Sequence, residues 1–337
     1  MSSMNDALAD AYQRNHLALG LGAGVSQDSR LPGWKELVCR VAEALPGVGR
    51  ATAEKLLKEG YEATVVATYL RSKADGDLRF ARAVRQSLYR DFTFREAVGK
   101  SNHRRFASHI RQTNPTLHAV GAMCAVPVGD DRYQPNPRIR AVVTFNLDDL
   151  LEEDTRARFK KRVLRTVERA SASASSSRIH VYHVHGYLVR HLPPRRKRDR
   201  TLEADDRLVL TEQQYFDVVA NANGFVNYTL LHLLREYQFL FVGLSMTDQN
   251  LRRALHLSYR ERFSELLAEG ETKADAGRRA TRHWSILKRR GKTLDDADTA
   301  LLNVLGVNPL WIRNWSEIPS LLCDLYEAGG DDWSEVA

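Results

Sequence analysis

Apolar residues follow two different spacings along the chain, and segments of the two kinds alternate. Short runs that are almost entirely apolar are typical of buried strands. They predict strands at His16–Gly22, Ile139–Phe145, Ile179–Val184 and Phe239–Gly243, and two shorter ones at Arg207–Thr211 and Leu310–Arg313. Because strands that alternate with helices form parallel sheets, the sequence predicts an α/β fold built on a parallel sheet.

The helical segments are marked by apolar residues three and four positions apart. This spacing runs from Trp34 to about Ala125, as in WKELVCRVAEAL, and predicts a large helical insertion at about residues 34–128. A basic helix is predicted over RARFKKRVLRTVERA (156–170), followed by a flexible serine-rich stretch. A charge-rich helical region is predicted over 249–290.

Composition narrows the class of protein. Of 337 residues, 43% are hydrophobic and 27% are charged, which is ordinary for a globular protein. Cys39, Cys124 and Cys323 are isolated from one another, so a zinc ribbon and a disulfide framework are excluded. The N-terminus lacks the apolar core of a signal peptide, and the longest apolar run, around Phe239–Met246, is too short for a membrane helix. We expect a soluble, cytoplasmic protein without membrane contact.

The net charge of +8 is concentrated in one segment. Residues Arg156–Arg200 carry 14 basic and two acidic side chains, a local balance of +12, so the rest of the chain stands at −4. This segment belongs to a basic connector predicted at about 153–200, which contains the loop Arg195–Arg198 (RRKR). A short charge run is usually a solvated surface, so the charge gives weak support for nucleic-acid binding.

Glycines and polar residues follow the predicted strands, which is where parallel α/β sheets bind their ligands. The strand ends are Gly20–Ser26 (GLGAGVS), Thr144–Asp148 (TFNLD), His183–Gly186 (HVHG) and Gly243–Asp248 (GLSMTD). Glycines let the backbone approach an anion, so the first segment suits a phosphate-binding turn, although a turn needed only for packing has the same sequence signature. The segment lacks the G-x-G-x-x-G spacing and the Gly-Lys-Ser/Thr of a triphosphatase loop.

Taken together, these motifs resemble the sirtuin-like family. Gly-Ala-Gly-x-Ser, Asn-x-Asp, His-Gly and Gly-x-Ser occur here in the family's order. SRLPGWKEL, FNLDDLLE, LVLTEQQYFD and FVGLSMTDQNLRRAL resemble its divergent bacterial branch. The similar stretches are 15–38, 138–152, 179–188, 207–219 and 237–255.

The resemblance implies a doubly wound, Rossmann-like fold that binds NAD+ and cleaves the bond between nicotinamide and ribose. The chain would form a single sirtuin-like domain over 1–337, with its core in 14–33 and 136–325. By position, Asn146 would be the catalytic asparagine, whose amide can orient a water, and His185 the catalytic histidine, which can take up a proton at neutral pH. The NAD+-binding residues would be Gly22, Ala23, Gly24 and Ser26 around the pyrophosphate, and Asp148, Gly243, Ser245 and Asp248 at the ribose and adenosine end.

The chain departs from the family's protein deacylases in its cysteines. Those sirtuins carry a small domain with four zinc-binding cysteines, which three cysteines cannot build. The chain therefore looks like the zinc-free bacterial relatives that hydrolyse NAD+ in antiphage defence. This implies an NAD+ glycohydrolase, with NAD+ as substrate and no metal, that depletes NAD+ during abortive infection. A homo-oligomer is expected, or control by a partner such as a HerA-type ATPase or an Argonaute-type sensor.

Two other functions stay open at this point. The chain could be a non-catalytic nucleotide sensor, or a DNA-binding component that uses Leu45–Gly60 (LPGVGRATAEKLLKEG), which resembles a helix-hairpin-helix motif. A plain turn between two helices of the insertion has the same pattern. For Asn146 the alternative is a helix cap, and for His185 a structural histidine beside a glycine turn. Trp34 and Trp311 are expected in the core rather than against a cofactor.

Overall fold

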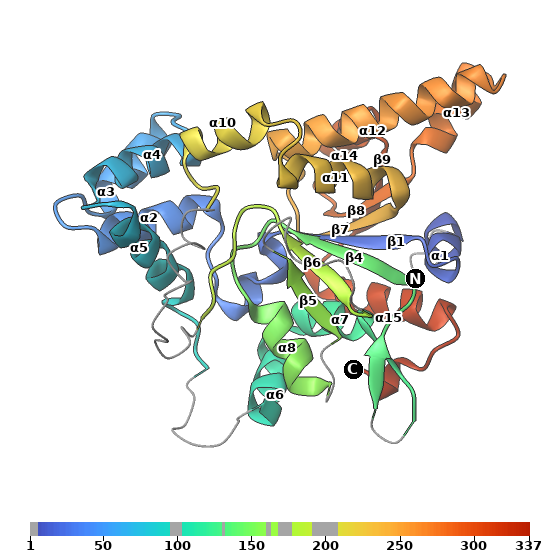
Figure 1. Cartoon of the computed structure of the whole chain (residues 1–337), viewed down its shortest axis with the longest axis horizontal. Helices are drawn as coiled ribbons and strands as arrows, with labels where there is room; N and C mark the ends of the chain where they lie inside the picture. The colour runs from blue at the N-terminus through green and yellow to red at the C-terminus, as the bar shows by residue number, and fades with distance from the viewer. Residues whose placement is uncertain (1–5, 95–102, 130–131, 160–162, 168–176, 191–207) are drawn as a thin grey trace.

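A central parallel sheet organises the chain (Figure 1). The computed structural model describes residues 6–94, 103–129, 132–159, 163–167, 177–190 and 208–337. Seven strands stand in the order β5–β6–β4–β1–β7–β8–β9, and each neighbouring pair among them is parallel. They are β1 (Leu17–Leu21), β4 (Ile139–Thr144), β5 (Leu164–Val167), β6 (Ile179–His183), β7 (Gln238–Val242), β8 (His283–Lys288) and β9 (Val307–Ile312). A separate antiparallel pair is formed by β2 (Ala125–Pro127) and β3 (Tyr133–Pro135).

Helices fill most of the remaining chain. Before β4 the structure has α1 (Asp6–Gln13), α2 (Trp34–Ala44), α3 (Arg50–Lys58), α4 (Ala63–Lys73), α5 (Asp77–Tyr89), α6 (His103–Thr113) and α7 (Pro115–Met123). After β4 come α8 (Leu150–Arg158), α10 (Glu212–Ala220), α11 (Phe225–Glu236), α12 (Gln249–Ala268), α13 (Lys273–Ala280), α14 (Lys292–Asn303) and α15 (Ile318–Ala328). Short 3-10 turns lie at Ala23–Val25, Gln27–Ser29, Trp315–Glu317 and Trp333–Glu335.

The centre of the sheet is buried on both faces, because its central strands are apolar on both sides. All five residues of β1 are buried. Successive strand residues point to opposite faces, so Leu17 and Leu19 join one apolar cluster while Ala18 joins the other. The first cluster includes residues of α2, α7 and α15, and the second includes residues of α11 and α12. The predicted α/β fold with a doubly wound, Rossmann-like parallel sheet is confirmed.

The helical insertion predicted between the first two core strands comprises α2 to α7. Figure 1 shows α2–α5 gathered beside the sheet, with α10 reaching from α4 toward α11. Val38, Leu70 and Val84 of these helices are completely buried in the same cluster as the leucines of β1. The insertion therefore shares the core of the sheet.

The turn at residues 45–49 joins two helices, as the hairpin-like pattern predicts. Gly47 and Gly49 have φ of +75° and +82°, and α3 begins immediately after them. Arg50 at this turn forms ion pairs with Glu36, Glu43 and Glu54. DNA contact at this turn stays a prediction.

Four sequence predictions were wrong in detail. The basic helix expected at 156–170 covers only the end of α8, which stops at Arg158, and Leu164–Val167 form strand β5 instead. The helical region expected at 249–290 contains strand β8 at His283–Lys288. Residues 208–210, the described part of the strand expected from Arg207, belong to no strand, and the last strand begins three residues earlier than expected, at Val307.

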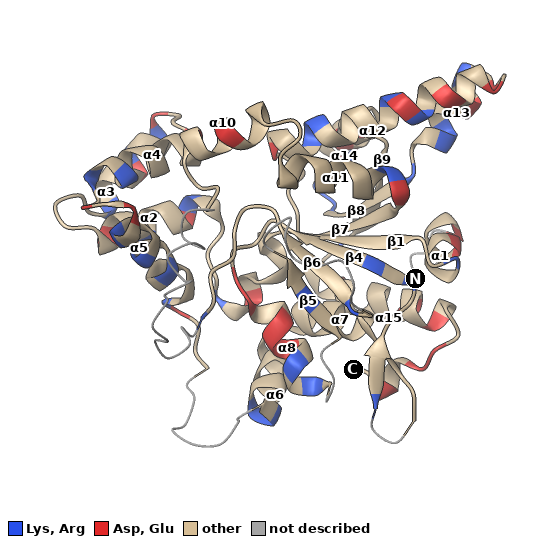
Figure 2. Cartoon of the chain, in the orientation of Figure 1, with Lys and Arg blue, Asp and Glu red and all other residues tan. Residues whose placement is uncertain are grey.

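Charged side chains lie mainly on the helices, and the two signs are interspersed along α12 and α13 (Figure 2). Much of the predicted basic connector at 153–200, including Arg195–Arg198, lies outside the described residues. Within the described part of the chain, no helix is long and apolar enough to span a membrane. The three cysteines are free thiols, of which Cys39 and Cys124 are buried.

Candidate active site

The sheet has a topological switch point beside β1. The chain builds β4, β5 and β6 on one side of β1 and then crosses to build β7, β8 and β9 on the other. In doubly wound sheets, ligands bind at the carboxyl ends of the strands next to such a point. The segments that follow β1, β4, β6 and β7 therefore meet in one region, as the sequence predicts.

The glycines after β1 and β7 let two loops approach each other closely. Gly22 and Gly24 donate backbone hydrogen bonds to Val242 and Gly243, at 3.0 and 2.9 Å. A Cβ on Gly22 would lie 2.5 Å from the Gly243 oxygen, and one on Gly24 would lie 2.8 Å from the Gly243 Cα. Gly243 itself has φ of +64°. Packing between the loops is thus a sufficient reason for these glycines, and pyrophosphate binding by Gly22, Ala23 and Gly24 stays a prediction.

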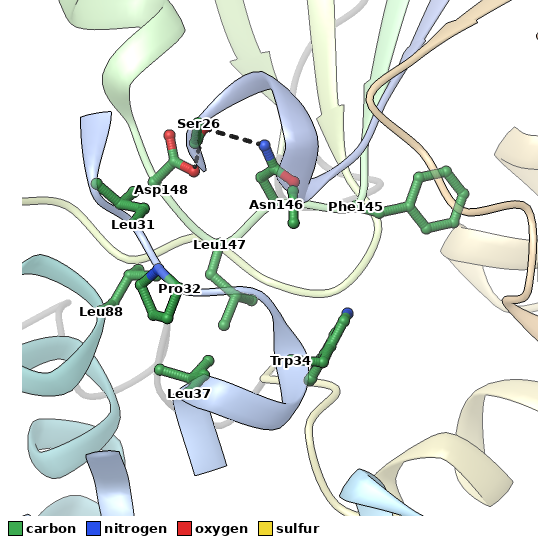
Figure 3. Close-up of a pocket in the computed structure, with 11 residues that line it drawn as sticks. Ser26, Leu31, Pro32, Trp34, Leu37, Leu88, Phe145, Asn146, Leu147 and Asp148 are labelled. Carbon is green, nitrogen blue, oxygen red and sulfur yellow. Dashed lines mark hydrogen bonds between the residues drawn. The ribbon is translucent and has the colours of Figure 1, made fainter. Parts of the chain in front are cut away.

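Ser26, Asn146 and Asp148 form one hydrogen-bonded cluster (Figure 3). The Ser26 hydroxyl donates to Asp148 Oδ2 at 2.9 Å, and Asn146 Nδ2 donates to Ser26 Oγ at 3.2 Å. Ser26 and Asp148 are buried, and Asn146 Oδ1 is buried without a hydrogen-bond partner. Because α8 begins later, with Asp149 as its N-cap, the helix-cap alternative for Asn146 is wrong.

Burial raises the pKa of Asp148, and the hydrogen bond from Ser26 opposes part of that rise. His183 and Glu152 lie behind the site and hold the loop that carries Asn146. His183 Nδ1 contacts the Asn146 carbonyl oxygen at 3.2 Å, and its Nε2 contacts Glu152 Oε1 at 2.8 Å. Although burial alone would lower it, the pKa of His183 is raised by the Glu152 carboxylate. His183 is therefore a supporting residue behind the site.

A cleft opens over this cluster and has a polar and an apolar side. It encloses about 370 Å³ of empty space, part of which is open to solvent. Ser26, Asn146 and Asp148 lie on one side, facing an apolar side to which the insertion contributes (Figure 3). The apolar lining residues are Ala23, Leu31, Pro32, Trp34, Leu37, Leu88, Phe145 and Leu147. Trp34 was expected in the core, but it is only partly buried and lines the cleft.

His185 lies next to the cleft, behind two of its lining residues. Its ring meets Trp34 and Phe145 nearly edge-on, with centroid distances of 5.6 and 5.2 Å. His185 Nε2 lies 3.4 Å from Asp248 Oδ2, which also accepts the Tyr215 hydroxyl at 2.9 Å. The Nδ1 atom of His185 is buried without a partner. The alternative of a structural histidine with both nitrogens satisfied does not fit this geometry.

The structure thus brings the predicted residues together in two groups. Ser26, Asn146 and Asp148 form the first, and His185 and Asp248 form the second. Ser245 stands apart on the exposed surface, where its hydroxyl bonds to Thr247 at 2.8 Å. Asp248 was predicted at the ribose and adenosine end, and here its carboxylate faces His185 and Tyr215.

Several residues of the site were missed from the sequence. Trp34, Leu88 and Tyr215 come from helices, where an apolar or aromatic residue at helical spacing looks like any core residue. The stretch LVLTEQQYFD, which resembles the family, contains Tyr215 as its one tyrosine, and this was the signal that the sequence offered. Among the described residues, no group of three or more His, Cys, Asp or Glu side chains could hold a metal ion.

The fold and the site together define a doubly wound α/β protein with a ligand cleft at the switch point. The chain belongs to the SIR2-like domain family, whose match covers residues 140–310, just over half of the chain. The match runs from β4 into β9 and contains Asn146, Asp148, His185, Gly243, Ser245 and Asp248. The loop Gly22–Ser26 lies outside it, although Ser26 bonds to Asp148 inside it. This family acts on NAD+. No curated protein matches the chain.

Proposed function

We propose that the chain is an NAD+ glycohydrolase that cleaves the bond between nicotinamide and ribose. The observation that carries the proposal is the pair of unpartnered buried atoms, Asn146 Oδ1 and His185 Nδ1, beside one cleft of a SIR2-like domain. A buried polar atom without a partner costs stability, so its presence favours a ligand that completes it. The cleft fits a flat ring that carries a polar group, because one side is apolar and the other is Ser26, Asn146 and Asp148.

The reaction is NAD+ plus water giving ADP-ribose, nicotinamide and a proton. The electron pair of the C1′–N bond goes to the ring nitrogen, so nicotinamide leaves neutral while the water oxygen bonds to C1′. Asn146 Nδ2 is held by Ser26, which leaves Oδ1 to accept a hydrogen from the water or a ribose hydroxyl. His185 Nδ1 takes up the proton that the water releases. Trp34 and Phe145 shield that histidine from bulk solvent.

The biological role that we propose is depletion of NAD+ as the effector of a bacterial antiphage defence system. An unrestrained enzyme of this kind is toxic to its host, so we also propose control by homo-oligomerisation or by a partner subunit, of which a HerA-type ATPase and an Argonaute-type sensor are candidates. The absence of four zinc-binding cysteines supports hydrolysis over protein deacylation.

The direct test is nicotinamide release from NAD+ by the purified chain, followed by chromatography. We expect Asn146→Ala and His185→Ala each to lower kcat by about 100-fold or more, since each removes a group that acts on the reacting atoms. His232→Ala and Asn303→Ala are matched controls, because both residues are exposed on distant helices. They should turn over NAD+ like the parent.

The outcomes separate the proposal from its alternatives. If the Asn146 and His185 variants hydrolyse NAD+ as fast as the parent, the assignment of the site is wrong. Tight NAD+ binding without release of nicotinamide would instead support a nucleotide sensor. Binding of duplex DNA that weakens steeply with salt would support the DNA-binding alternative.

A further inference from the structure

His185 is enclosed on three sides by aromatic residues from three different elements. Trp34 comes from α2, Phe145 follows β4, and Tyr215 lies on α10 with its ring centroid 6.4 Å from that of the histidine. Only 6% of His185 is exposed. Asp248 and Tyr215 are the titratable side chains in contact with its ring among the described residues, so they determine its proton arrangement.

Asp248 faces His185 from the start of α12 and is itself held in place. Its Oδ1 accepts the Leu251 backbone N–H at 2.7 Å, as the N-cap of α12, and its Oδ2 accepts the Tyr215 hydroxyl. The Tyr215 hydroxyl in turn accepts the Asn250 backbone N–H at 2.8 Å. Burial alone would raise the pKa of Asp248, but its contact with His185 lowers it below the usual value. The carboxylate is therefore charged at neutral pH.

The separation of 3.4 Å between His185 Nε2 and Asp248 Oδ2 is long for a hydrogen bond. Such contacts between catalytic groups often tighten only when the substrate binds. With a carboxylate on the Nε2 side, that nitrogen carries the hydrogen and Nδ1 keeps its lone pair. The free lone pair is then on the nitrogen that has no protein partner.

We infer that Asp248 and Tyr215 are positioning residues that fix His185 in the tautomer with the hydrogen on Nε2, leaving Nδ1 as the proton acceptor. This inference rests on the proposed function of the site. When Nδ1 takes a proton from the attacking water, the imidazolium forms against the Asp248 carboxylate, which stabilises its charge. The hydrogen on Nε2 stays where it is.

The position of Tyr215 also depends on the helical insertion. Its helix α10 starts with a capping box, in which the side chains of Thr211 and Gln214 bond to each other's backbone N–H. Thr68 of α4 accepts the Glu212 N–H and donates to Gln213, each at 3.0 Å. The insertion therefore fixes the helix that presents Tyr215 to Asp248.

The test uses a substitution that keeps the helix cap but removes the carboxylate. Asp248→Ser preserves an N-cap residue, yet its side chain is too short to reach the histidine. Asp248→Asn keeps an acceptor oxygen without the charge and serves as the conservative variant. Asp332→Ser, at another N-cap, and Tyr228→Phe, at an exposed tyrosine, are the matched controls for Asp248 and Tyr215.

Two measurements are made on each full-length variant. Ring 15N NMR spectra of histidine-labelled protein, with the His185 signal assigned by its loss in His185→Gln, give the tautomer without any substrate. We expect Asp248→Ser to mix the two tautomers. In turnover, kcat should fall by about 10- to 100-fold with little change in KM, and Tyr215→Phe should have a smaller effect in the same direction.

The two measurements distinguish the inference from the proposed function. If Asp248→Ser leaves the tautomer of His185 as it is in the parent, the inference is overturned, whatever the turnover. If the NMR changes occur as expected but the parent releases no nicotinamide, the positioning role stands and the proposed function falls. A kcat loss matched by Asp332→Ser would also overturn the inference.

Discussion

Individual residues in the site region carry charges that burial has made costly, and Asp149 is the clearest case. Its Oδ1 lies 2.9 Å from the Tyr89 hydroxyl, and its Oδ2 accepts the Arg190 N–H at 3.0 Å. Burial, with the nearby charge of Glu153, raises the pKa of Asp149 to about 7. Between about pH 4 and 7 the folded chain holds a proton there that the unfolded chain has released, since an unfolded aspartate titrates near pH 4.

This shift predicts a stability that falls as pH rises. Between about pH 4 and 7 the folded state binds more protons at Asp149 than the unfolded state, so the free energy of unfolding decreases with pH and levels off above 7. Asp149→Asn should remove this contribution, which is at most about 4 kcal/mol. Urea unfolding at pH 5 and pH 8 measures it: the variant should lose less stability over that interval than the parent.

Asp332→Asn is the comparison for that experiment. Its hydrogen bond with Ser334 lowers the pKa of Asp332, so this group titrates below the interval in both states. It should leave the difference between pH 5 and pH 8 unchanged. An Asp149→Asn variant with the same difference as the parent would show that Asp149 is ionised throughout.

Among single residues, the sequence predicted which polar side chains lie at the site, but not how they contact one another. Ser26, Asn146 and Asp148 were predicted together because each follows a strand, and parallel strands end at one edge of the sheet. The contact between Asp248 and His185 depends on the direction in which α12 leaves its strand, and Tyr215 reaches it from a separate helix. No local pattern encodes such a meeting of distant segments.

Among the elements, strands with mostly apolar sequences were predictable, and strands bordered by charged residues were not. β1 and β7 are almost entirely buried and form apolar runs, and β4 is interrupted only by the exposed Arg140. β5 has four residues, two of them partly exposed, inside a run of arginines and lysines that resembles a helix. β8 follows α13 after two residues and is flanked by arginines. Residues 208–210 have the composition of a strand. The backbone hydrogen bond described for them runs from the Val209 N–H to the His185 carbonyl oxygen, which is too little to form a strand pair.

The close approach of the two glycine loops gives a prediction at the scale of elements. In Gly243→Ala the new Cβ would lie 2.5 Å from the Val25 nitrogen, on a backbone already at φ of +64°. Because the contact is with backbone, the loops must move apart. We expect a loss of roughly 3 kcal/mol or more in the free energy of unfolding, together with weaker turnover of NAD+.

Gly270→Ala measures the conformational part of that loss alone, so the difference between the two variants gives the steric part. Gly270 has φ of +92°, but a Cβ there would meet nothing within 4 Å. Its substitution should cost only the conformational strain of about 1–2 kcal/mol. Equal losses at the two positions, measured by urea unfolding, would show that the contact between the loops is not tight.

For the whole molecule, the question is whether the helical insertion is a separate module. The family match begins only at residue 140, so sequence similarity alone would divide the chain after α7. Packing indicates the opposite, because Val38, Leu70 and Val84 share one apolar cluster with Leu17 and other strand residues. The insertion also supplies Trp34 and Leu88 to the cleft. We therefore propose that the chain folds as one domain over 1–337.

If the chain is one domain, it should unfold in one main step, with α13 as the exception. In native-state hydrogen exchange at rising urea, amides of α5 and of β4 should converge on the same free energy of opening, that of global unfolding. The internal comparison is α13, whose Ala276 and Ala280 belong to a small cluster with Leu266, apart from the main core. It should open at a distinctly lower free energy. If α2–α5 instead open together well before β4, the insertion is an independent unit, and its contribution to the cleft is then an interface that a partner could disrupt.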